Sequence, residues 1–142
     1  GGGMSSRLFQ EIREIRGLAY SIYSYLQCYS DGGLFGVYAG TGKKDVFNLV
    51  PLIKDEIFKL SQTINKEEVD RAKTQIKAGH LMSLESTSSR CEQVARQTMI
   101  YGQPLKLNKI VANIENVNET GLMRVGDILL NSPSTLTTLG PA

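Results

Sequence analysis

The spacing of apolar residues changes several times along the chain, and each change predicts a different element. The first pattern runs from residue 8 to residue 15, behind the good N-cap residues Ser5 and Ser6 and ahead of Gly17, a common helix stop. Its apolar positions, at helical spacing, are Leu8, Phe9, Ile12 and Ile15. The pattern therefore predicts a short amphipathic helix that ends before Gly17.

Residues 18 to 41 change to the alternating pattern of strands. Tyrosine, isoleucine and leucine alternate with serine in residues 18 to 29, turn-forming residues occupy 30 to 33, and residues 34 to 41 resume the extended pattern. Successive side chains of a strand point to opposite faces, so this segment predicts an antiparallel β-hairpin with two different faces. One face of its first strand would carry Tyr20, Ile22, Ser24, Leu26 and Cys28, and the other Tyr23, Tyr25 and Tyr29.

Helical periodicity recurs in four later segments. They run from the turn at residues 42 to 45 to about residue 63, from the Asn65 cap to about residue 84, from the cap at residues 86 to 89 to the stop at Gly102, and from 119 to 130. The expected buried stripes are Val50, Ile53, Ile57 and Leu60 in the first of these helices and Val69, Ala72, Ile76 and Gly79 in the second.

Pro51 interrupts the first of these helices. Its ring removes the amide that would bond to the Phe47 carbonyl, which predicts either a kink near Phe47 or a helix that begins at Val50. Residues 135 to 139 predict a short final strand. The fold class is therefore α/β (α+β): an antiparallel hairpin plus a late strand, packed with several helices. So few strands for this much helix suggest that other strands come from outside the chain.

Composition restricts the class of protein further. The 142 residues fit a single domain, 41% are hydrophobic and 21% charged, and no apolar run is long enough for a membrane helix. The net charge of +2 is spread along the chain rather than gathered in a basic block, so we expect no nucleic-acid partner. We expect a soluble protein with Cys28 and Cys91 reduced, in a cytoplasmic or mitochondrial-matrix-like compartment.

Arg13 and Tyr20 are candidates for chemistry because a tight turn at Gly17 would bring their side chains together. An arginine fork can donate to a peptide carbonyl, and a tyrosine hydroxyl can donate to an oxygen that becomes negative during hydrolysis. The structural alternative stays open: Arg13 and Arg16 could simply complement the negative end of the helix, with Tyr20 packed in the sheet.

The sequence contains too few suitable side chains for a catalytic zinc site. A catalytic zinc site needs three converging protein ligands, and the chain offers one histidine, His80, and two distant cysteines, Cys28 and Cys91. We therefore predict no metal site in this chain. His80 falls on the same helical face as Val69 and is expected to be partly buried and hydrogen-bonded.

The opening segment GGGMSSRLFQEIREIRGLAYSIYS, residues 1 to 24, resembles the signature of the C-terminal half of the pitrilysin family of zinc peptidases, which includes insulin-degrading enzyme and the mitochondrial processing peptidases. Without the residues that follow, its glycine run could equally be an appended linker. Residues 33 to 36, AKTQIKAGHLMSLES (72 to 86), SRCEQVARQTMIYGQP (89 to 104) and the closing TTLGP (137 to 141) extend the resemblance over nearly the whole chain, with the processing peptidases and their bacterial relatives most similar.

The resemblance implies a role for Arg13 and Tyr20. In the family, an arginine and a tyrosine at this separation help to bind the substrate backbone opposite the zinc, and the metal is held by an inverted H-x-x-E-H motif that this chain lacks. The resemblance thus implies a single partial domain over residues 1 to 142, with the preceding strand and helix missing and the zinc in an N-terminal domain or subunit. The fragment alone should be inactive.

Three functions are compatible with the resemblance. The first is the substrate-binding C-terminal portion of a zinc endopeptidase that cleaves peptides or presequences. The others are the metal-free subunit of a two-chain peptidase and a core-type structural subunit of a respiratory complex, which is similar in fold. In each case an unpaired sheet edge could join two copies of the chain into a homo-oligomer.

Overall fold

The computed structural model describes residues 3 to 140, which fall into two compact units. The first unit comprises Gly1–Thr63 and Arg124–Ala142, and the second Ile64–Met123. Gly1 and Gly2 of the glycine run and Pro141 of the closing motif lie outside the described residues. That the two units form one partial domain stays a prediction.

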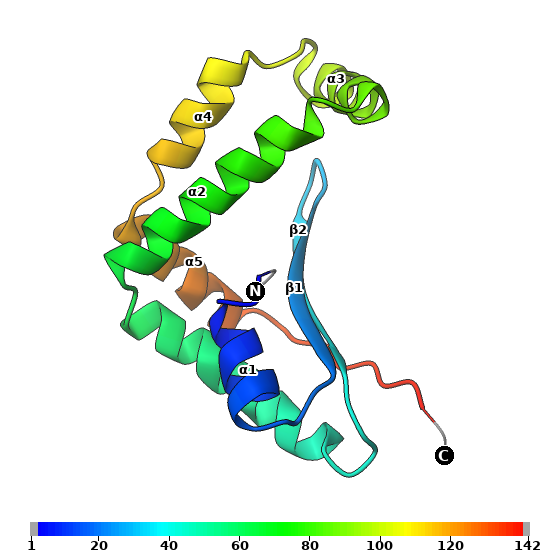
Figure 1. The fold of residues 1–142 in the computed structure, drawn as a ribbon, viewed down its shortest axis with the longest axis vertical. Helices are drawn as coiled ribbons and strands as arrows, with labels where there is room; N and C mark the ends of the chain where they lie inside the picture. Colours follow the sequence, from blue (N-terminus) through cyan, green and yellow to red (C-terminus); the bar gives the residue numbers. More distant parts are fainter. Residues whose placement is uncertain (1–2, 141–142) are drawn as a thin grey trace. The chain divides into compact units, whose positions relative to one another are not determined.

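The first unit is built on the expected hairpin. Strands β1 (Ser21–Cys28) and β2 (Gly33–Gly40) pair antiparallel, with Ile22 opposite Ala39 and Tyr23 opposite Tyr38 (Figure 1, blue to cyan). The backbone N–H of Tyr29 donates to the Gly32 carbonyl at 2.9 Å and closes the turn. The predicted hairpin and its mixed α/β surroundings are confirmed.

The two faces of the hairpin differ in burial only near the start of β1, since Leu26, on the same predicted face as Ile22, is 68% exposed. Ile22 is buried on one face, whereas Tyr23 and Tyr38 on the other face are about half exposed and stack with their ring centroids 5.2 Å apart. The ring of Tyr25 lies over Gly36, where any Cβ would overlap it. Gly36 therefore lets the Tyr25 ring lie across the neighbouring strand, and a larger residue there would have to displace the ring.

The first helix is a π-helix, η1 (Phe9–Ile15). The Ser6 hydroxyl accepts from the Phe9 N–H at 3.3 Å, and Gly17 ends the segment with φ of +63°, so the expected cap and stop are both present. Ile12 is fully buried, but Ile15 is 68% exposed, and its place in the apolar stripe was predicted wrongly. The reason is the wide turn of a π-helix, about 4.4 residues, which puts residues three apart on different faces.

Helix α1 (Val46–Gln62) completes the core of the first unit. Leu49 is buried with Ile12 and Ile22, while Leu52 and Ile53 pack against them. The helix begins before Pro51 and continues through it, so the predicted start at Val50 is wrong.

The buried stripe of α1 is also rotated by about one residue from the prediction. Glu56 is buried and Leu60 is 44% exposed. The Lys59 ammonium donates to the Glu56 carboxylate at 2.9 Å, and this pairing lets a charged side chain occupy a position that the apolar pattern did not reveal.

Helix α5 (Glu119–Asn131) matches its prediction and passes from the second unit into the first. Gly126 meets Ser61 at the end of α1 so closely that a Cβ on the glycine would lie 2.7 Å from the serine Cβ. The predicted late strand is wrong, since residues 133 to 139 have no regular secondary structure. A strand needs a neighbour for its backbone groups, and in the described part of the chain β1 and β2 pair only with each other.

The second unit is helical: α2 (Lys66–Ser83), α3 (Thr87–Tyr101) and α4 (Leu107–Glu115). Asn65 caps α2 by accepting from the Glu67 N–H at 2.9 Å, Ser86 caps α3, and Gly102 ends α3 with φ of +74°. These three signals were predicted correctly. Helix α4 was missed, although its sequence carries the helical signal of apolar residues at 107, 110, 111 and 114.

The buried side of α2 also differs from the prediction. Val69 is buried, but Ile76 is 57% exposed. Helix α4 packs on the side of α2 that carries Lys73 and Lys77, both half-buried, because these lysines bind Glu115 at the end of α4. Lysine stems can cover apolar surface while their ammonium groups pair, so polar residues occupy a contact face that periodicity assigned to solvent.

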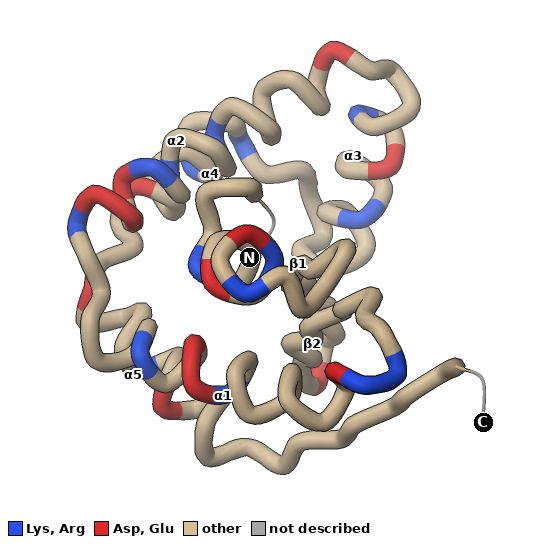
Figure 2. Tube along the Cα trace, turned by 60° about the horizontal axis from the view of Figure 1, so that its bottom comes forward, with Lys and Arg blue, Asp and Glu red and all other residues tan. Residues whose placement is uncertain are grey.

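Charge is distributed unevenly over the elements. Strands β1 and β2 contain no charged residue, whereas charged residues lie on the helices and on the turn after β2 (Figure 2). None of the helices in residues 3 to 140 has the length and apolar content needed to cross a membrane.

Candidate functional site

Arg13 lies near the end of η1, and the turn that follows brings the chain back beside it. The Arg13 carbonyl accepts from the backbone N–H groups of Arg16 and Gly17, the latter at 3.1 Å. The Tyr20 N–H then donates to the Gly40 carbonyl at 2.8 Å, where the hairpin begins. The two candidate side chains are thus fixed to opposite ends of one tight turn.

The structure brings Arg13 and Tyr20 together. The guanidinium carbon of Arg13 lies 5.8 Å from the centroid of the Tyr20 ring and 4.6 Å from that of Phe9. The Arg13 side chain is 39% exposed, and Tyr20 is 85% exposed. Both donors can therefore reach a ligand from solvent, and neither is enclosed in an apolar pocket.

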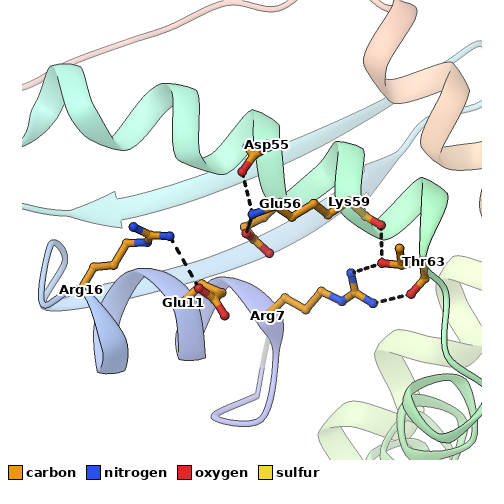
Figure 3. Close-up of polar contacts among 7 residues, drawn as sticks. All are labelled: Arg7, Glu11, Arg16, Asp55, Glu56, Lys59 and Thr63. Carbon is orange, nitrogen blue, oxygen red and sulfur yellow. Dashed lines mark hydrogen bonds and ion pairs between the residues drawn. The ribbon is translucent and has the colours of Figure 1, made fainter.

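The purely structural alternative applies to both arginines, because each has a carboxylate neighbour. Arg16 lies 3.8 Å from the Glu11 carboxylate, as an ion pair along η1 (Figure 3). Arg13 has a carboxylate contact of similar length, 3.7 Å from its Nε to Glu14, and its guanidinium also stacks on rings. Tyr20 is not packed in the sheet, and within residues 3 to 140 its hydroxyl makes no hydrogen bond to protein.

A second polar cluster holds α1 in place within the same unit. Lys59 lies 2.7 Å from Asp55 and 2.9 Å from Glu56, and the hydrogen bonds that its ammonium donates to these carboxylates hold the pKa of Lys59 well above its usual range. Arg7 donates to the hydroxyl and carbonyl of Thr63 at 3.0 and 2.6 Å (Figure 3). The Arg7 contacts tie the segment just before η1 to the end of α1, whereas the Lys59 contacts lie within α1.

The second unit has its own ionic contact. Lys77 donates to the Glu115 carboxylate, Lys73 donates to the Glu115 carbonyl at 2.9 Å, and the hydrogen bond from Lys77 lowers the pKa of Glu115. His80 lies further along α2 at the edge of an open hollow of about 150 Å³. Its Nε2 is buried without a hydrogen-bond partner in the described chain, so the predicted hydrogen bond is wrong at that atom.

Metal ligands do not converge within residues 3 to 140. No three histidine, cysteine, aspartate or glutamate residues come close enough there to hold an ion. Cys28 and Cys91 are both exposed free thiols. The donors present therefore do not fit a zinc site.

Sequence reasoning missed one neighbour of the candidate site. Phe9 was assigned only to the apolar stripe, yet its ring lies closer to the Arg13 guanidinium than the Tyr20 ring does. The signal was the spacing of an aromatic residue four positions before an arginine on a helix, which places the two side chains next to each other.

The segment that carries Arg13 and Tyr20 is also the one that matches a known protein family. The family model described as the peptidase M16 inactive domain matches residues 1–76. An uncharacterized zinc protease of Rickettsia felis is 37% identical over 141 residues, which cover 99% of this chain and 34% of that protein. The uncharacterized zinc protease YmxG of Bacillus subtilis is 38% identical over 119 residues, 83% of this chain and 29% of that protein. The chain thus spans about a third of the length of these relatives.

Solved structures resemble the fold. A peptidase M16 inactive domain from Pseudomonas fluorescens superposes with a TM-score of 0.74 at 25% identity, covering 88% of this chain and 30% of that one. A chain of Complex III2 from Candida albicans superposes with a TM-score of 0.78 at 24% identity, covering 87% and 30%. At such identity the second match establishes a shared fold.

Proposed function

Since this chain belongs to the peptidase M16 inactive-domain family, we propose that it is the substrate-binding C-terminal portion of a zinc-dependent endopeptidase. A separate N-terminal domain or subunit carries the zinc. The observation that carries the proposal is the approach of the Arg13 guanidinium to the Tyr20 ring, 5.8 Å, with both side chains accessible. The natural substrate class is a peptide or presequence.

Each side chain has a distinct part in the proposed chemistry. Arg13 offers several N–H donors and no acceptor, so it suits the carbonyl oxygens of an extended peptide backbone. The Tyr20 hydroxyl donates to the carbonyl oxygen that gains negative charge when water adds to the scissile bond. Support comes from the exposure of that hydroxyl, which has no protein hydrogen bond to lose within residues 3 to 140.

The zinc stays outside this chain in the proposal. When bound in its own domain, the metal activates the attacking water. The residues of this chain bind and orient the peptide. The 142-residue chain alone should therefore show no peptide hydrolysis, with or without added zinc.

Substitutions at the pair test the proposal in the longer protein or two-chain assembly that contains this chain. Arg13→Ala and Tyr20→Phe should each lower peptide turnover by about tenfold to a thousandfold, with zinc content unchanged. Matched controls are Arg16→Ala, which removes an arginine paired with Glu11, and Tyr29→Phe in the hairpin turn. Equal turnover in the Arg13 and Arg16 variants would refute the assigned role.

A structural role is the second candidate. The superposition on a chain of Complex III2 favours a core-type subunit that supports an assembly without cleaving peptides. The same variants separate the two functions: a scaffold would tolerate Arg13→Ala and Tyr20→Phe without loss of assembly or activity. The metal-free subunit of a two-chain peptidase would instead lose turnover when it is mixed with its zinc-bearing partner.

We also propose that the hairpin can pair with a second copy of the chain. Strands β1 and β2 each leave one edge unpaired within the described residues, and neither carries the charged side chains that commonly block edge pairing. Light scattering coupled to size-exclusion chromatography tests this proposal. A dimer that dissociates on dilution supports pairing, and a monomer at high concentration refutes it.

A further inference from the structure

Phe9 is the closer of the two aromatic neighbours of Arg13. It opens η1 one turn before Arg13, and the guanidinium carbon lies 4.6 Å from its ring centroid. Tyr20 flanks the same guanidinium at 5.8 Å. The Arg13 guanidinium therefore lies within cation–π distance of two rings, one half-buried and one 85% exposed.

Stacking on a ring suits an arginine that must keep its donors available. The ring attracts the cation through its negative face, while the N–H groups of the planar guanidinium point outward in its own plane. An ion pair would instead occupy those N–H groups with carboxylate oxygens. Arg13 and Arg16 each have a carboxylate neighbour, Glu14 at 3.7 Å and Glu11 at 3.8 Å, but neither distance is short enough for a hydrogen bond, so the N–H donors of Arg13 are still available.

Phe9 is more shielded from solvent than the carboxylate neighbour of Arg13. Phe9 lies between Leu8 and the fully buried Ile12 in η1, and its N–H donates to the Ser6 hydroxyl at 3.3 Å. Its ring is half-buried, whereas Glu14, the other contact of Arg13, has a side chain that is 51% exposed. A long flexible side chain loses rotamer freedom when it binds a ligand, and a fixed stacking surface removes part of that loss in advance.

We propose that Phe9 is a positioning residue, which stacks on the Arg13 guanidinium and holds it beside Tyr20 before a peptide binds. The inference rests on the proposed function of Arg13. In this role Phe9 acts through Arg13 rather than on the peptide. Its loss should therefore weaken peptide binding through Arg13 and leave the chemical step largely unaffected.

Two substitutions of Phe9 test this role in the zinc-containing assembly. Phe9→Leu should raise KM by about two- to fivefold, the value of an exposed cation–π contact, with kcat nearly constant. Phe9→Tyr keeps the ring and should restore KM to the wild-type value. Thermal melting of both variants checks folding, and Phe9→Tyr keeps the test valid if Phe9→Leu is unstable.

A second readout measures the stacking itself in the 142-residue chain. Nuclear magnetic resonance of the Arg13 side chain should show protons shifted upfield by the Phe9 ring, and the shift should disappear in Phe9→Leu and persist in Phe9→Tyr. If the shift is absent in the wild type, or if KM is the same in all three proteins while Arg13→Ala is impaired, the positioning role is overturned and the proposed function stands. Unchanged turnover in Arg13→Ala overturns the proposed function, and with it the role of Phe9.

Discussion

Replacement of Ile12 by alanine tests the core and the π-helical register together. Ile12 is fully buried in the first unit, against Leu8, Ala19, Ile22 and Leu49. The change removes three carbon atoms, which at about 0.8 kcal/mol each amounts to roughly 2.4 kcal/mol of lost burial. A cavity adds to this, so the free energy of unfolding should fall by about 2 to 5 kcal/mol.

Ile15 supplies the matched control because it is the same residue type in the same helix. It is 68% exposed, so Ile15→Ala removes the same three carbon atoms with little loss of burial. Its effect on the free energy of unfolding should stay within about 0.5 kcal/mol. In an α-helix the two positions, three residues apart, would lie on nearly the same face. The contrast between the two variants therefore depends on the wide turns of η1.

Urea unfolding of the two variants and the wild type, followed by far-ultraviolet circular dichroism, measures the difference. The midpoint for Ile12→Ala should fall well below that of the wild type, with the slope unchanged. Similar losses in Ile12→Ala and Ile15→Ala would refute the reasoning, because they would mean that both side chains face the core.

Three further predictions use the same unfolding assays on the full chain. Gly126→Ala should destabilise it by about 1 to 3 kcal/mol, since the new methyl would press on Ser61, as a lower melting temperature would reveal. Gly79→Ala should stabilise it by about 0.5 to 1 kcal/mol, because this helical position has open space around it; a lower midpoint would contradict that. Glu115→Gln should be less stable than wild type at neutral pH, because the hydrogen bond from Lys77 lowers the pKa of Glu115. The stabilisation that the ionised Glu115 contributes is present above the pKa of an unfolded glutamate and is lost as the pH falls through the lowered pKa. The two melting temperatures should converge on acidification, and a constant gap would refute this linkage.

Local sequence signals were enough to predict most of the helices and the hairpin. The caps at Asn65 and Ser86 and the positive φ of Gly17 and Gly102 depend on a few neighbouring residues, and the sequence identified all four positions. Similarly, the alternation of residues 18 to 41 was enough to predict the hairpin. Such features need no knowledge of distant partners.

Errors came where the outcome depended on distant partners or on an uncommon turn. The side of α2 that meets α4 is set by Lys73 and Lys77 binding Glu115, about forty residues away, which periodicity treats as solvent-facing. Residues 133 to 139 have a strand-like composition but pair with no strand in the described chain. The buried Glu56 likewise depends on Lys59.

The candidate site was predictable in one respect and not in another. The turn at Gly17 predicted that Arg13 and Tyr20 would approach, and the structure places them 5.8 Å apart from guanidinium carbon to ring centroid. The stacking of Phe9 on Arg13 was not predicted, although their spacing of four residues on a helix is compatible with it, because spacing alone does not fix side-chain orientation. The proposed roles of Arg13 and Tyr20 in peptide hydrolysis stay a prediction.

The tyrosines of the hairpin also give the chain an optical reporter. Five of its six tyrosines lie between residues 20 and 38, and there is no tryptophan. Ultraviolet emission therefore originates largely from this segment, without an indole to mask it. A tryptophan-containing peptide that settles near Tyr20 would accept excitation energy from these phenols, so its arrival could be timed by stopped-flow spectroscopy with no dye attached to the protein.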